Sequence, residues 1–221
     1  MKTSLLPRLL GVFLGVSAFA AEPVTPETTY TWMDQNDPAT AEITSLGTRY
    51  LDQVGANLVT EVTRTLAANG AGAAVDKLHL PNLTLPPAQP GKPHVTAVKR
   101  TSLYLRNPAN APDAADRAAL DKIYFALRAG DAPPKLIFQK VETPGAATEW
   151  RLYRPVVTLP SCVQCHGPAD QVSASVRVAL QRRFPEDQAV GYAAGEWRGL
   201  LRVSIEAPAV APVAAPAPAG K

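Results

Sequence analysis

Hydrophobic side chains recur every three or four residues between positions 41 and 69, which is the spacing of one face of an α-helix. They are Ile43, Leu46, Tyr50, Leu51, Val54, Leu58, Val62 and Leu66. Asn69–Gly70 then offers a stop, because glycine readily takes the left-handed conformation that ends many helices. The pattern predicts a long amphipathic helix over residues 41–69, followed by a short helix over residues 73–78.

The chain after this helix alternates β-rich runs with helical stretches. Strands are predicted over residues 95–102, 136–141, 150–157 and 197–205. The second and third of these are joined by a hairpin turn at Pro144–Gly145. Helices are predicted over residues 113–130 and 172–184, and the segment 161–167 is expected to be compact and turn-like. A helix followed by strands with intervening helices predicts an α+β fold on an antiparallel sheet.

Proline marks the parts of the chain that do not form the domain. The sequence has 22 prolines among 221 residues, about twice the average usage of roughly 5%, and proline interrupts both helices and sheets. A proline-rich loop is predicted at residues 81–93, and a disordered Pro/Ala-rich tail at residues 207–221. Residues 21–39 are read as an extended lead-in, which leaves residues 40–206 as one folded domain.

The first 20 residues have the features of a secretory signal peptide. Lys2 and Arg8 precede a short apolar run, and Ala18–Phe19–Ala20 supplies the small-x-small cleavage pattern. The apolar run is shorter than the roughly 20 residues that a membrane span needs, although a retained anchor is the alternative. Without Lys2 and Arg8 the formal net charge falls from +3 to +1, and no basic block suggests nucleic acid. We therefore expect an exported protein, most simply periplasmic, with no stable membrane span after cleavage.

The chain has two cysteines, and they lie in the sequence Cys162–Val163–Gln164–Cys165–His166. C-x-x-C-H is the attachment pattern for c-type haem. Thiols three positions apart lie about one helical turn from each other, so that both can add to one porphyrin, and the adjacent His166 can be the proximal iron ligand. A thioredoxin-type dithiol, a short-range disulfide and a zinc site are the alternatives. We expect one covalently bound haem c, although small cytochromes generally carry this motif early and here it comes late.

Few residues are available as a second axial ligand of such a haem. His79 and His94 are the other histidines, and Met33 is the methionine that would remain after signal cleavage. His79 lies between two leucines just before the proline-rich loop, and it is the preferred candidate. His94, Met33 and an open coordination position remain alternatives.

Three separated segments together resemble a family of single-haem, c-type, PAS-like haem domains. This family was long catalogued as a bacterial domain of unknown function, and its domains occur alone or as sensor modules. The similar segments are Arg100–Thr101–Ser102, the run from Arg106–Asn107–Pro108 to Asp113, and the stretch from Phe184–Pro185 to Ser204 that follows C-x-x-C-H. The resemblance spans about residues 40–206.

The resemblance implies a PAS-like antiparallel sheet with a long N-terminal helix, and a haem held by Cys162, Cys165 and His166. Some members have a cysteine ligand on the distal side, but Leu78 stands at that place here. The neighbouring His79 matches variants of the family that have a histidine instead. This departure favours His79 as the distal ligand.

These observations predict an electron-transfer or redox protein that works with a separate redox partner. The alternative is a haem-based redox or gas sensor with a separate signalling partner. Arg100 and Arg106 are candidates to pair with haem propionates, and Tyr192 is a candidate to pack on the porphyrin. A peroxidase needs a distal acid–base group, which the sequence does not single out, so a non-enzymatic role is favoured.

Overall fold

The computed structural model describes residues 27–78, 85 and 87–208. The helices are α1 (Ala41–Lys77), α2 (Ala114–Ala129), α3 (Pro160–His166) and α4 (Ala174–Arg183). Two 3₁₀ helices are η1 (Pro38–Thr40) and η2 (Pro108–Asn110). The strands are β1 (Thr29–Trp32), β2 (His94–Thr101), β3 (Ile137–Glu142), β4 (Glu149–Val157) and β5 (Trp197–Glu206). The α+β fold with a long N-terminal helix is thus confirmed.

The five strands form one antiparallel sheet in the order β1-β3-β4-β5-β2. The chain makes the β3–β4 hairpin through Pro144–Gly145, as the sequence predicted. Strand β1 was not predicted, because it is only four residues long and lies in the segment 21–39 that was read as an extended lead-in, and all four of its residues are exposed. It pairs with β3 and forms one edge of the sheet. β2 forms the other edge.

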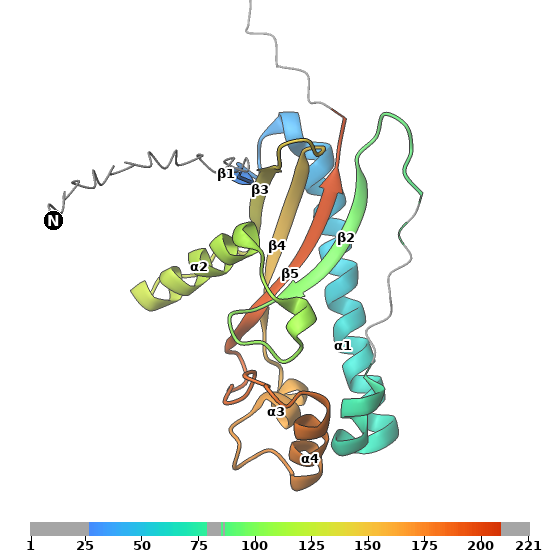
Figure 1. Cartoon of the computed structure of the whole chain (residues 1–221), viewed down its shortest axis with the longest axis vertical. Helices are drawn as coiled ribbons and strands as arrows, with labels where there is room; N and C mark the ends of the chain where they lie inside the picture. The colour runs from blue at the N-terminus through green and yellow to red at the C-terminus, as the bar shows by residue number, and fades with distance from the viewer. Residues whose placement is uncertain (1–26, 79–84, 86, 209–221) are drawn as a thin grey trace, which may run out of the picture.

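Helix α1 runs along one face of the sheet (Figure 1). Its Ile43, Leu51 and Val54 are buried against Leu152 and Val203 of the central strands. The helix approaches closely because position 47 has no side chain. A Cβ added to Gly47 would lie 2.7 Å from a methyl carbon of Leu152.

Helix α2 packs on the opposite face, and it begins at a capping box. Asp113 accepts a hydrogen bond from the backbone N–H of Asp116, and the Asp116 carboxylate accepts one in return from the backbone N–H of Asp113. Leu120 and Ile123 of α2 are buried with Tyr153 of β4. Tyr153 follows Leu152, so the side chains of these adjacent β4 residues lie on opposite faces of the sheet.

Helix α1 changes direction at Gly70, where φ is 69° and ψ is 164°. The predicted stop at Asn69–Gly70 is therefore a kink, and the short second helix continues to Lys77. This second part of α1 packs against α4. A Cβ on Gly72 would lie 2.8 Å from Cβ of Ser175, and Arg183 donates to the backbone oxygens of Val75 and Asp76.

The segment around the two cysteines differs from its prediction. Residues 160–166 form helix α3, not a turn. Pro160 occupies the first turn of α3, where its missing N–H costs nothing. Helix α4 and strand β5 agree with their predictions to within two residues.

Some predictions fall on residues whose placement is not described. The signal peptide at residues 1–20, the histidine at position 79, part of the proline-rich loop at residues 81–93 and most of the tail at residues 207–221 lie outside the described part of the chain. No helix in the described part is long and apolar enough to cross a membrane.

Candidate functional site

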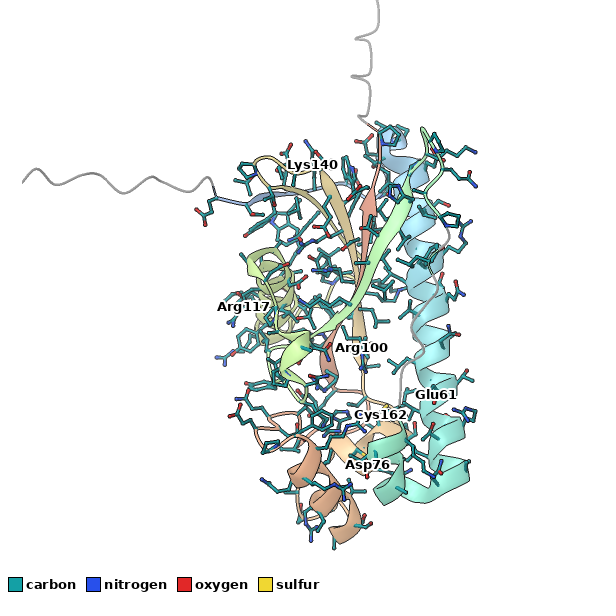
Figure 2. All side chains as sticks on the ribbon, turned by 45° about the vertical axis from the view of Figure 1, so that its right-hand side comes forward. Glu61, Asp76, Arg100, Arg117, Lys140 and Cys162 are labelled. Carbon is teal, nitrogen blue, oxygen red and sulfur yellow. The ribbon has the colours of Figure 1, made fainter. Side chains whose placement is uncertain are left out.

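A cavity of about 300 Å³ opens at the end of the sheet where α3 and α4 lie. Its walls come from the kinked part of α1, the adjoining ends of β2, β4 and β5, and the helices α3 and α4. Figure 2 shows Cys162 in the lower part of the molecule, with Arg100 above it and Asp76 of the second part of α1 below it. The size lies at the lower limit of the roughly 300–1,000 Å³ of ligand pockets.

Helix α3 places both thiols at the cavity. Cys162 and Cys165 are three positions apart on a helix, so they share one face, and both are partly exposed free thiols that line the cavity. Burial raises the pKa of the Cys165 thiol, with an opposing effect from the positive charge of Arg106. The helix ends at Gly167, where a Cβ would lie 2.6 Å from the carbonyl oxygen of Val163.

The imidazole of His166 is oriented by the backbone of the segment that precedes β5. Its Nδ1 lies 2.7 Å from the carbonyl oxygen of Ala189. Because a carbonyl only accepts, Nδ1 carries the proton and Nε2 keeps its lone pair. Burial, together with the positive charges of Arg106 and Arg198, lowers the pKa of His166 to about 3. The ring is therefore a neutral base whose Nε2 lone pair can coordinate a metal, and in this structure a guanidinium nitrogen of Arg106 lies 3.4 Å from that atom.

Arg106 connects helix α3 to the segment before β5 that contains Ala189. Its guanidinium forms a salt bridge to Asp187 at 2.9 Å and donates to the backbone oxygens of Cys165 at 2.6 Å and Ala189 at 3.2 Å. One of its nitrogens lies 3.4 Å from Nε2 of His166. The residue that was predicted to pair with a propionate is thus mainly engaged by the protein itself.

Tyr192 lies behind the histidine and does not line the cavity. Its ring meets the His166 ring edge to face at a centroid separation of 6.3 Å. Its backbone N–H donates to the carbonyl oxygen of His166 at 2.9 Å. These contacts hold the His166 ring in place, and the contact of Tyr192 with a porphyrin stays a prediction.

The charged side chains that line the cavity are all arginines. They are Arg100, Arg106, Arg183 and Arg198. No carboxylate is among the described lining residues. Arg198 was not singled out in the sequence. It is one of two arginines in β5, and nothing in the sequence of this strand marks it as a binding residue.

The wall formed by α1 is apolar. Leu58, Val62 and Leu66 line the cavity from the first part of the helix, and Ala74, Val75 and Leu78 from the second. Leu78 is the last described residue before the preferred ligand candidate at position 79. Among the described residues, no side chain on this wall offers a strong metal ligand.

The other two ligand candidates lie elsewhere. His94 is at the far end of β2, where its Nε2 lies 3.9 Å from a carboxylate oxygen of Glu206. Arg100 at the cavity lies six positions further along the strand, about 20 Å away at 3.3 Å per residue. Met33 packs against the core on the α1 face, and its backbone N–H donates to Phe138. The structure therefore brings neither residue to the cavity.

Residues 64–206 match the family model of the Tll0287-like proteins. The chain belongs to the Tll0287-like family. This match confirms the family resemblance that the three sequence segments indicated. Among solved structures, the chain is similar to the crystal structure of the cyanobacterial heme-protein Tll0287, with 20% sequence identity and a TM-score of 0.43. The aligned part covers 77% of this chain and 96% of the other. No curated protein matches the chain.

In this member of the Tll0287-like family the lining residues form a consistent donor set. Two thiols and a neutral imidazole with an unprotonated Nε2 lie on the α3 wall. Arginines line the same cavity, and the buried Nε of Arg198 has no hydrogen-bond partner in the described part of the chain. Such a site suits a flat apolar ligand that can react with two thiols, accept an imidazole and carry negative groups.

Proposed function

We propose that this protein binds one haem c covalently in the cavity, through Cys162 and Cys165, with His166 as the axial ligand of the iron. The observation that carries this proposal is the position of all three residues on one wall of a single cavity. The family match supports it as well, because the similar cyanobacterial structure is described as a heme-protein. When bound, the iron of haem c supplies one-electron redox chemistry.

The protein orients the His166 imidazole through its own contacts, without any haem. The hydrogen bond from Nδ1 of His166 to Ala189 selects the tautomer that presents Nε2, and it makes the imidazole a better electron donor. The contacts from Arg106 and Tyr192 hold the same ring and its neighbouring backbone in place. Arg106 and Tyr192 therefore fix the orientation of His166.

The cavity walls suit a largely apolar, planar group. Val59, Val157 and Leu159 line the cavity and remain exposed, at 44%, 47% and 37%. A haem would cover these side chains and remove their apolar surface from water. The lining arginines give the cavity the positive charge that suits propionates. Of the two that the sequence put forward, Arg100 and Arg106, only Arg100 has no protein partner among the described residues.

The second axial position is assigned to His79 in this proposal. Support comes from Leu78, which precedes it and lines the cavity on the α1 wall, and from the locations of His94 and Met33 away from the site. Two imidazole ligands leave no position at the iron for a substrate or gas. We therefore propose electron transfer with a separate redox partner, in the periplasm after export by the signal peptide.

A gas- or redox-sensing role is the second candidate. The observation that favours it is the apolar wall of α1, which offers no ligand among its described residues. If His79 does not coordinate, a small gas has room beside this wall. Such a sensor would need a separate signalling partner.

Coexpression with a cytochrome c maturation system tests the whole proposal. Haem that stays on the polypeptide in a denaturing gel, and is lost in Cys162→Ala/Cys165→Ala, is the expected result. Absence of covalent haem from the wild type would contradict the proposal. Spectra of the reduced protein with and without carbon monoxide then decide the role, because a His79-ligated iron resists carbon monoxide and an open site binds it readily.

The ligand itself is identified with paired variants. His79→Ala is expected to change the spectrum and admit carbon monoxide, while His94→Ala serves as the control and leaves both unchanged. Unchanged ligation in His79→Ala would contradict the assignment of His79.

A further inference from the structure

The four arginines that line the cavity differ in how their donors are used. Arg106 is engaged by Asp187 and by the carbonyl oxygens of Cys165 and Ala189. Arg183 donates to the carbonyl oxygens of Val75 and Asp76. These two arginines connect parts of the wall to each other. Neither presents a full set of free donors to a ligand.

Arg100 has no such partner. In the described part of the chain its guanidinium makes no salt bridge or hydrogen bond, although it lines the cavity from the end of β2. It pairs across the sheet with Leu201, whose side chain belongs to the core on the α1 face. Directly opposed residues of an antiparallel pair share a face, so Arg100 points to the α1 side, where the cavity lies. The surrounding chain and the nearby charge of Arg198 lower its pKa to about 10, and it remains a cation at neutral pH.

Arg198 is held in place by its own set of contacts. One terminal nitrogen donates to Oγ of Ser102 and, at 3.0 Å, to the carbonyl oxygen of Tyr104. The guanidinium lies over the ring of Tyr192, 5.4 Å from its centroid. Its Nε is buried without a partner in the described residues. A buried donor without an acceptor costs free energy, and here it belongs to a side chain that is otherwise fixed.

The cavity thus has two guanidinium groups that repel each other. Neither makes a salt bridge among the described residues, although the charge of Asp187 acts on Arg198. Like charges held close together repel, and an anion that binds both relieves the repulsion. We propose that Arg100 and Arg198 together bind the two propionate carboxylates of the haem, and that Ser102 is the positioning residue of Arg198. This inference rests on the proposed haem site. It assigns the propionates to a pair that includes Arg198, and it assigns Arg106 to the support of the His166 wall.

The test compares haem with its dimethyl ester, in which both propionates are neutral. The full chain carrying Cys162→Ala/Cys165→Ala is used, so that both compounds bind without covalent attachment, and each affinity is measured by absorbance titration. Each charge-assisted hydrogen bond is worth about tenfold or more in affinity. We expect this chain to prefer haem over the ester, and Arg100→Gln and Arg198→Gln each to reduce the preference roughly tenfold.

Three further variants complete the test. Ser102→Ala is expected to lower the preference for haem over the ester less than Arg198→Gln does. If Arg198→Gln does not fold, Ser102→Ala still tests the contact that positions Arg198. Arg117→Gln removes one exposed arginine of α2 and is expected to leave the preference unchanged. Arg106→Gln is expected to weaken haem and ester equally.

Each alternative outcome has a distinct meaning. If the preference for haem is the same with and without Arg100 and Arg198, the pair does not bind propionates, and the inference is wrong while the haem site stands. A chain that retains Arg100 and Arg198 could also bind haem and ester equally, and inorganic phosphate could stabilise its haem-bound form. That result would show that the two arginines bind a separate anion, and it would overturn the inference. If neither compound binds and the wild type acquires no covalent haem, the proposed function itself fails.

Discussion

The guanidinium of Arg106 lies 2.9 Å from the carboxylate of Asp187, 81 positions away in the sequence. The two side chains are 14% and 9% exposed, so water screens this ion pair only weakly. The same guanidinium reaches the backbone of Cys165 and Ala189. One residue thus connects the segment after β2 to both backbone segments that orient His166.

Replacing Arg106 with glutamine is expected to destabilise the fold. The change leaves Asp187 without its partner in a mostly buried place, and breaking a buried ion pair costs about 3 kcal/mol. The free energy of unfolding is measured by urea denaturation followed by tryptophan fluorescence. Arg117→Gln is the matched control, since that exposed pair with Asp121 contributes less than about 0.5 kcal/mol. Equal losses in the free energy of unfolding of the two variants would show that Arg106 does not stabilise the segments around Cys165 and Ala189.

Asp116 is expected to be the most sensitive carboxylate of the protein. It lies in the first turn of α2 and is fully buried. Lys99 and Arg202 each lie 2.9 Å from its oxygens, and Tyr153 donates to it at 3.2 Å. Asp116→Asn leaves these cations without their shared anion, which predicts a loss of about 3–5 kcal/mol in the free energy of unfolding.

The measurement for Asp116 pairs urea denaturation with absorbance of the haem-loaded protein. None of the described residues in the Asp116 network lines the cavity, so the absorbance spectrum is expected to stay the same in any folded fraction. Asp121→Asn on the outer side of α2 is the control and should have little effect. A spectral change with intact stability would contradict this separation of the two faces.

Acid is expected to weaken the start of α2 through Asp113. Burial raises the pKa of this carboxyl, but the backbone N–H of Asp116 and the guanidinium of Arg151 outweigh that effect, and the net pKa is lowered. A lowered folded-state pKa means that the stabilisation is complete above the unfolded pKa of about 3.9 and is lost as the pH falls through the folded value.

Urea midpoints measured from pH 6 to pH 3 test this sign. The wild type should lose more stability than Asp113→Asn as the pH falls, because asparagine has no charge to lose. Parallel pH profiles for the two proteins would contradict the assignment to Asp113.

The sequence was sufficient for the parts of the fold that have a long repeating pattern. The spacing of apolar residues predicted α1, α2 and four of the strands, and the glycine at position 70 marked the kink. Helix α3 has seven residues, too few for a helical period to be recognised. Strand β1 has four exposed residues, so its place in the sheet follows from pairing with β3 and not from its own pattern.

The candidate site shows a similar division. The C-x-x-C-H motif identified Cys162, Cys165 and His166, because chemistry requires those residue types at that spacing. Ala189 was out of reach, since it acts through a backbone oxygen that any residue could supply. Arg198 was missed because its significance comes from contacts with Ser102 and Tyr104, 96 and 94 positions away.

The close approach of β2 and β5 at Gly199 gives the last prediction. A Cβ at this position would lie 2.4 Å from the carbonyl oxygen of Thr101 and 3.1 Å from Cβ of Ser102. Because the nearest atom is backbone, the strands must separate to admit a methyl group, and overpacking of this kind costs about 1–3 kcal/mol. Arg100 and Arg198 lie on these two strands beside the contact, so the separation should also reduce the preference for haem over its dimethyl ester.

Gly55→Ala is the matched control, because its Cβ would lie 3.8 Å from Leu201 in ordinary contact and alanine favours the helix. If Gly199→Ala changes neither the stability nor the preference, the two strands are not held as closely as the structure describes.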